Sequence, residues 1–175
     1  RRSYSPFESD IRSGTADVYQ HEMPGGQYTN LREQARAMGL GSRWAEVSKA
    51  YATANRLFGD IVKVTPSSKV VGDLALAMVA NNWSEQDILD PDREIDFPAS
   101  VISMMRGELG TPPDGWPSAL QNKVLKGAAP IQGRPGAHLP SVDLAAAKAE
   151  AESLCETELS PRDLASYLMY PKVFS

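Results

Sequence analysis

The chain has little cysteine, and it has no long apolar run; each shortage excludes a class of protein. Its single cysteine, Cys155, rules out an intramolecular disulfide and fits a reducing compartment. Four glutamates within five residues of Cys155 make its surroundings electronegative, unlike those of a catalytic cysteine, so we interpret it as a passive thiol. No apolar stretch approaches the roughly 18–20 residues that cross a bilayer. The first residues of the sequence contain no apolar run of the kind that forms a secretory signal.

The chain also has no excess of positive charge. Lys and Arg number 18 against 22 Asp and Glu, a net charge of −4, so the composition gives no electrostatic footprint for nucleic acid or an anionic membrane. At 175 residues, 42% of them hydrophobic, the chain is long enough for one domain with a core. It begins without Met, and we expect it to be part of a longer protein.

Histidine is rare, and the chain lacks a pattern for metal binding or for a self-sufficient active site. His21 and His138 each lack a second histidine or cysteine at ligand spacing, so we interpret both as structural or surface residues and expect no metal site. The run Pro24-Gly25-Gly26-Gln27 lacks the lysine of a phosphate-binding loop. If the chain belongs to an enzyme, other catalytic residues must come from outside it.

Hydrophobic periodicity predicts a mostly helical chain with little strand. We expect residues 16–23 to be a short extended segment that Pro24-Gly25-Gly26 breaks, with Asn30 and Glu33 as the capping box of the next helix. Start signals predict further helices that open near residues 42, 67, 84, 98, 118, 143 and 160. Residues 127–140 are rich in Gly and Pro and are expected to form a wrap or linker.

The most informative segment runs from Val62 to Asp73, through a proline into a helix. Because Pro66 disfavours the α region for Thr65, the Thr65 hydroxyl can point away from the helix axis. The helix N-terminus favours negative charge, so Lys69 in the first turn hints at a ligand or a neighbouring carboxylate. The alternative is an ordinary N-cap by one of the two serines of Thr65-Pro66-Ser67-Ser68-Lys69, beside a solvated lysine.

Motifs along nearly the whole chain resemble those of one family, the biotin-dependent pyruvate carboxylases. The segments that carry this resemblance are 14–19, His21-Glu22-Met23-Pro24-Gly25-Gly26-Gln27-Tyr28-Thr29-Asn30-Leu31, 38–41, 54–60, 62–73, 97–98, 123–126, 133–136 and 169–171. The resemblance implies the C-terminal portion of the carboxyltransferase domain, over residues 1–175, with the wrap at 127–140 and terminal helices over 141–175. In the family this portion is a helical, funnel-like extension that follows a TIM-type barrel.

The resemblance also implies a reaction, in which a carboxyl group moves from carboxybiotin to pyruvate and gives oxaloacetate. Carried over by motif, the catalytic residue is Thr65, whose hydroxyl relays a proton between pyruvate and biotin, since a hydroxyl donates and accepts at once. Ser68 and Lys69 correspond to residues of the biotin pocket. Biotin itself, a divalent metal such as Zn or Mn, and Mg-ATP are held by parts of the enzyme outside this chain, so we expect the chain alone to be inactive.

Two other functions remain open at this stage. The chain resembles transcarboxylase subunits and oxaloacetate decarboxylase α chains around the Pro24-Gly25-Gly26 and Thr65–Lys69 motifs, and it could instead be a helical module that serves only assembly. The expected partners are the remainder of the same polypeptide, with its barrel, biotin carboxylase and biotin carrier, in a homotetramer. The expected compartment is a bacterial cytoplasm, or the mitochondrial matrix in a eukaryote.

Overall fold

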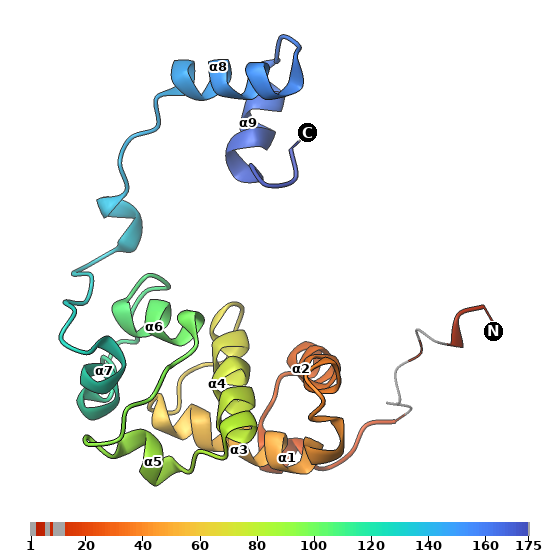
Figure 1. The fold of residues 1–175 in the computed structure, drawn as a ribbon, viewed down its shortest axis with the longest axis vertical. Helices are drawn as coiled ribbons and strands as arrows, with labels where there is room; N and C mark the ends of the chain where they lie inside the picture. Colours follow the sequence, from red (N-terminus) through yellow and green to blue (C-terminus); the bar gives the residue numbers. More distant parts are fainter. Residues whose placement is uncertain (1–2, 6–7, 9–12, 175) are drawn as a thin grey trace. The chain divides into compact units, whose positions relative to one another are not determined.

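A computed structural model of the chain describes residues 3–5, 8 and 13–174, and it confirms the mostly α fold (Figure 1). Among these residues there is no strand. None of the helices in the described ranges is long and apolar enough to cross a membrane. The helices are α1 (Val18–His21), α2 (Gly25–Ala37), η2 (Gly41–Arg43), α3 (Trp44–Leu57), α4 (Ser67–Asn81), α5 (Glu85–Leu89), α6 (Ala99–Arg106), α7 (Ser118–Leu125), η3 (Pro135–His138), α8 (Leu144–Cys155) and α9 (Pro161–Met169).

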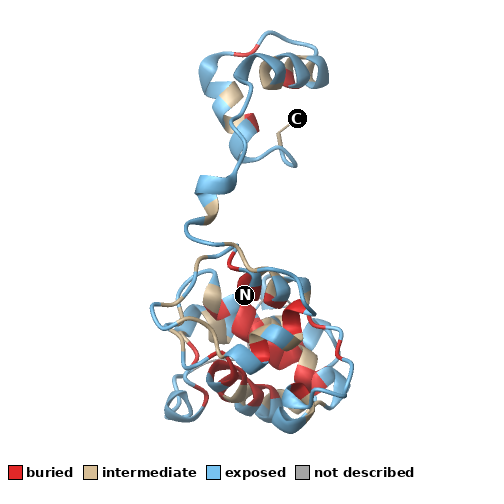
Figure 2. Cartoon of the chain, turned by 90° about the vertical axis from the view of Figure 1, so that its left-hand side faces the viewer, coloured by how far each residue is buried: buried red, intermediate tan, exposed pale blue. Residues whose placement is uncertain are grey.

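The chain forms two compact units, residues 1–137 and residues 138–175. In the first unit α4 is the central helix, because α2, α3 and α6 all pack against it. Its apolar side chains are buried nearly all round, as expected for a helix in the middle of a core; they are Val70, Val71, Leu74, Ala75, Leu76, Met78 and Val79. Figure 2 shows the buried residues gathered inside this unit.

The second unit is a pair of helices, α8 and α9, that pack on each other. Its small core consists of Ala151, Leu159 and Tyr167, with Phe174 in edge contact with the Tyr167 ring. Both helices start as predicted: Asp143 caps α8, and Ser160 with Asp163 makes a capping box in front of Pro161.

The start of the chain departs from the sequence prediction. Residues 18–21 form the short helix α1 and are not extended. The preceding segment does end before Pro24, but Pro24 is the N-cap of α2, so Gly25 and Gly26 are helical and the Asn30–Glu33 pair lies inside the helix. The physical reason is that proline suits the start of a helix, where the N–H it lacks has no intrahelical partner.

A close approach of α2 to α4 depends on Gly72. A methyl group on Gly72 would lie 2.9 Å from the Leu31 Cδ1 and 2.6 Å from the Gln27 Nε2. We expect Gly72→Ala to destabilise the protein by roughly 1–2 kcal/mol, because overpacking outweighs the gain in helix propensity. The control is Gly26→Ala, where a methyl group meets nothing within 4 Å. The thermal unfolding midpoint checks this, and a midpoint unchanged by Gly72→Ala would contradict it.

Candidate functional site

The predicted site lies where the loop after α3 enters α4. Residues 61–64 are in neither helix nor strand, the Thr65–Pro66 peptide is cis, and Pro66 is the N-cap of α4. Thr65 is exposed, and it lines a hollow of about 340 Å³. The hollow is therefore open to a ligand that reaches the Thr65 side chain, and its volume is in the usual range for small-molecule sites.

The far wall of this hollow was not predicted. It comes from the segment that follows α6, residues 109–113, together with Trp116 and with Met104 of α6. Residues 111–117 are rich in Pro and Gly, and their sequence by itself indicates only a cluster of turn residues. The large apolar Trp116 inside that cluster was the one signal for a packed wall, and its ring meets Phe58 edge-on with centroids 6.4 Å apart.

Neither serine of the motif caps α4 through its side chain, contrary to the alternative prediction. The Ser67 hydroxyl lies 2.8 Å from the Val64 carbonyl oxygen and 3.0 Å from that of Val62, and it accepts from the Val64 N–H. Ser67 therefore fastens the loop in front of the helix and does not satisfy the helix N–H groups. The reason is that the chain folds back over the helix start, which brings those carbonyl oxygens within reach.

The structure places Ser68 and Lys69 differently from Thr65. Ser68 is buried at 8% exposure, and its carbonyl oxygen accepts a hydrogen bond from the Tyr51 hydroxyl. Lys69 is exposed, and its ammonium lies 2.7 Å from the Asp73 carboxylate. Neither residue lines the hollow that contains Thr65. The three predicted residues thus share one junction, but within the described chain they do not surround one cavity.

An ion pair links this junction to the motif around His21. The Lys63 ammonium lies 3.0 Å from a carboxylate oxygen of Glu22, the residue that caps α1 with a positive φ of 57°. Lys63 is two residues before Thr65, and its side chain is only 16% exposed. The pair therefore ties the loop that carries Thr65 to the turn between α1 and α2.

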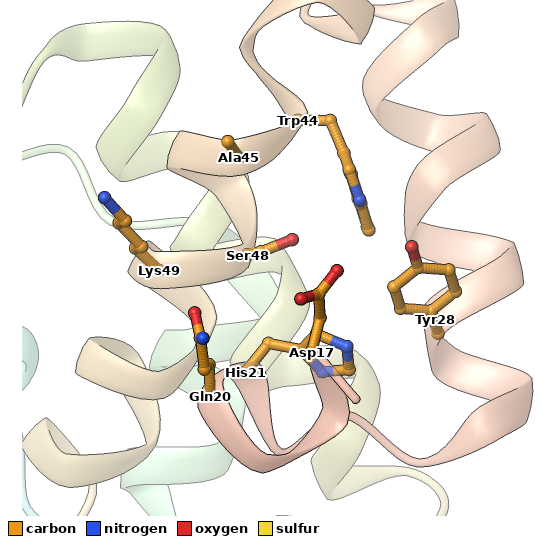
Figure 3. A pocket seen from close by; sticks show the side chains of 8 residues that line it. All are labelled: Asp17, Gln20, His21, Tyr28, Trp44, Ala45, Ser48 and Lys49. Atoms are coloured by element: carbon orange, nitrogen blue, oxygen red, sulfur yellow. The ribbon is translucent and has the colours of Figure 1, made fainter. Parts of the chain in front are cut away.

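A second hollow, of about 210 Å³, lies between α1, α2 and α3 and includes none of the predicted site residues (Figure 3). The Asp17 carboxylate faces the space between Ser48 and the ring of Tyr28. His21 forms part of its floor; its Nδ1 accepts a hydrogen bond from the Met23 N–H at 2.9 Å, and its ring lies 5.0 Å from that of Tyr28. His21 is thus a buried structural residue.

Burial lowers the pKa of His21, and Asp17 opposes this only in part. The unfolded chain, with a histidine pKa near 6.5, then binds a proton more readily than the folded one, so stability falls as pH drops below about 6.5 toward the folded pKa. We expect the thermal midpoint to fall less between pH 7.5 and 5.5 in His21→Asn than in the unchanged protein. Equal falls in the two proteins would contradict this.

No group of three or more His, Cys, Asp or Glu that could hold a metal ion occurs in residues 3–5, 8 and 13–174. The motif residues therefore offer hydroxyls, an ammonium and apolar walls. This set can bind a neutral or anionic ligand and can pass a proton, since a hydroxyl both donates and accepts.

Comparison with known proteins gives consistent matches over the whole chain. Residues 18–175 match the conserved carboxylase domain. The chain is 50% identical over its full length to the pyruvate carboxylase of Bacillus subtilis and 47% identical to the mitochondrial pyruvate carboxylase of Homo sapiens, and it spans 15% of each. It is similar to a solved structure, the carboxyl transferase domain from Rhizobium etli pyruvate carboxylase with pyruvate and biocytin. The TM-score is 0.93 at 58% identity, over 98% of this chain and 29% of that one.

Proposed function

The chain belongs to the conserved carboxylase domain family, and from this membership we propose that it contributes to carboxyl transfer from carboxybiotin to pyruvate, which gives oxaloacetate. It does so as the C-terminal portion of a carboxyltransferase domain. The relatives reported above are pyruvate carboxylases, which favours this function over a transcarboxylase or an oxaloacetate decarboxylase component. The chain spans 15% of those relatives, and we propose that a barrel and the other catalytic parts lie in the remainder of the same polypeptide.

The observation that carries the proposal is the position of Thr65. Its side chain is exposed beside a hollow at the entrance to α4, and the loop that holds it is fastened by the Ser67 hydroxyl and by the Lys63–Glu22 ion pair. A proton relay needs a hydroxyl that a substrate can reach and that is held in a fixed place. Both conditions support Thr65 in that role.

The proposed proton transfer through Thr65 needs no charged form of the threonine side chain. The Thr65 oxygen accepts a proton from the methyl group of pyruvate while the Thr65 O–H donates its own proton to the ureido nitrogen of biotin. The C–H bond of pyruvate breaks, and its electron pair forms the enolate that takes up the carboxyl carbon. When bound, carboxybiotin would supply that carbon as carbon dioxide: the bond between its ureido nitrogen and the carboxyl carbon would break, and the electron pair left on the nitrogen would take the proton from Thr65.

Ser68 and Lys69 are proposed to hold the ureido end of biotin. The Lys69 ammonium is a donor suited to the carbonyl oxygen and the developing negative charge of that group. Ser68 is buried in the first turn of α4, and its polar atoms lie beside Lys69, where the loop that carries Thr65 enters the helix. A divalent metal and Mg-ATP would take their ligands from outside this chain, and no step here runs through them.

The test is the complete enzyme with Thr65→Ala, assayed for two reactions. Carboxylation of pyruvate should be lost, whereas bicarbonate-dependent ATP cleavage, which needs a different domain, should remain. Normal production of oxaloacetate would rule out the relay and would favour a helical module that serves only assembly.

We further propose that the complete protein is a homotetramer in a bacterial cytoplasm or, in a eukaryote, in the mitochondrial matrix.

A further inference from the structure

The ammonium of Lys69 is held by a carboxylate that is itself held from another helix. The Asp73 Oδ2 lies 2.7 Å from the Lys69 Nζ, and the same oxygen accepts a hydrogen bond of 2.6 Å from the Ser100 hydroxyl. Lys69 and Asp73 are one turn apart on α4, whereas Ser100 lies in the first turn of α6, which packs on α4. The lysine is therefore linked, through two contacts, to the packing of α6.

The exposure of the two charged side chains, Asp73 and Lys69, shows which one is fixed. The Asp73 side chain is 18% exposed, and the Lys69 side chain is 58% exposed. The carboxylate is thus the anchored member of the pair, and the ammonium is the accessible one. An exposed lysine on a flexible four-carbon stem would otherwise sample many rotamers, and fixing it in one position costs side-chain entropy.

The charges around the Lys69 ammonium also favour a role in binding a ligand. Lys69 is in the first turn of α4, where the helix dipole disfavours a cation, and Asp73 offsets that cost. An ammonium has three N–H donors, so the contact with one oxygen of Asp73 leaves donors for a ligand. Because Ser100 donates to that same oxygen, its hydroxyl offsets part of the negative charge of the carboxylate. The carboxylate therefore attracts the Lys69 ammonium less strongly.

We propose that Asp73 and Ser100 are positioning residues that hold the Lys69 ammonium ready for the ureido group of biotin. The proposal rests on the proposed function, in which Lys69 contacts biotin. Neither positioning residue touches the reacting atoms. Asp73 sets where the ammonium lies, and Ser100, from α6, fixes the carboxylate that does so.

The experiment uses the complete enzyme and the variants Ser100→Ala and Ser100→Thr. The readouts are pyruvate carboxylation, ATP cleavage, and decarboxylation of oxaloacetate with free biotin as the probe. Loss of one hydrogen bond to a charged group predicts a rate of pyruvate carboxylation about three- to tenfold lower in Ser100→Ala. The KM for free biotin should rise, ATP cleavage should not change, and Ser100→Thr, which keeps the hydroxyl, should restore most of the rate.

The matched control is Ser103→Ala on the same helix. The Ser103 hydroxyl donates to the Glu108 carboxylate, in the turn that follows α6, so its loss should leave carboxylation unchanged. The decisive measurement uses the double variant that combines Ser100→Ala with Lys69→Gln. If Ser100 acts through Lys69, it should add no further loss to Lys69→Gln, whereas a purely structural role would add its full effect.

The outcomes separate this proposal from the proposed function. If Lys69→Gln keeps full activity, the assignment of Lys69 to biotin is wrong, and the positioning proposal fails with it. If Lys69→Gln is impaired but Ser100→Ala behaves like Ser103→Ala, only the positioning proposal is overturned. A loss in Ser100→Ala that persists undiminished in the Lys69→Gln background would also overturn it.

Discussion

Replacement of Thr65 by alanine in the complete enzyme is expected to lower pyruvate carboxylation by about 10²- to 10⁴-fold, the usual contribution of a positioned proton-transfer group. ATP cleavage should stay near its normal rate, because carboxylation of biotin does not use this hydroxyl. Thr65 is exposed, so the loss of its methyl and hydroxyl groups should change the free energy of unfolding by no more than about 0.5 kcal/mol. The effect should therefore be one of chemistry and not of folding.

The matched control for this prediction is Thr65→Ser, which keeps the hydroxyl and removes only a methyl group. It should retain activity within about tenfold of the unchanged enzyme, since the relay needs the O–H and little else. Equal losses in Thr65→Ser and Thr65→Ala would show that the methyl group, and hence packing, matters more than proton transfer. Full activity in Thr65→Ala would exclude Thr65 as the proton relay.

The second large effect concerns the helix that carries the site. Leu74 has no exposed surface and lies at the middle of α4, so Leu74→Ala should destabilise the first unit by about 2–5 kcal/mol through lost burial and the cavity it leaves. Hydrogen exchange of the α3 and α4 amides checks this in the complete protein, because it reports local opening in a multidomain chain.

The control for that prediction is a leucine of the same size on the surface. Leu154 of α8 is 65% exposed, so Leu154→Ala should change stability by less than about 0.5 kcal/mol. If both substitutions accelerated exchange in α4 equally, or if neither did, α4 would not be the centre of the core. In that case the site would lack the rigid support that the proposed function assumes.

The sequence predicted helices well where local signals suffice. Ser84 with Asp87, and Ser160 with Asp163, form capping boxes, and Asp143 caps α8, because these side chains bond to N–H groups only two or three residues away. The same kind of reasoning failed at Asn30, where the pattern of a capping box occurs inside a helix. A cap motif cannot reveal that an earlier residue, Pro24, has already started the helix.

Long-range contacts account for the other differences. The helix predicted to open near residue 42 has Arg43 as its N-cap, without a side-chain capping hydrogen bond. The Arg43 guanidinium instead donates to the Val79 carbonyl at 2.8 Å and to the Asn82 side-chain oxygen at 2.9 Å. These partners are 36 and 39 residues away, at the end of α4. Local propensity gives only a weak prior, and tertiary contacts of this kind override it.

The sequence by itself determined that the chain is helical and that Thr65, Ser68 and Lys69 meet at one helix entrance, because proline, capping groups and helical periodicity act over a few residues. Only the tertiary structure decided that α4 is buried nearly all round, that a segment some 45 residues away walls the Thr65 hollow, and that Ser100 reaches the carboxylate beside Lys69. These features depend on which helices pack together, and packing depends on the whole set of apolar surfaces at once, which no local pattern encodes.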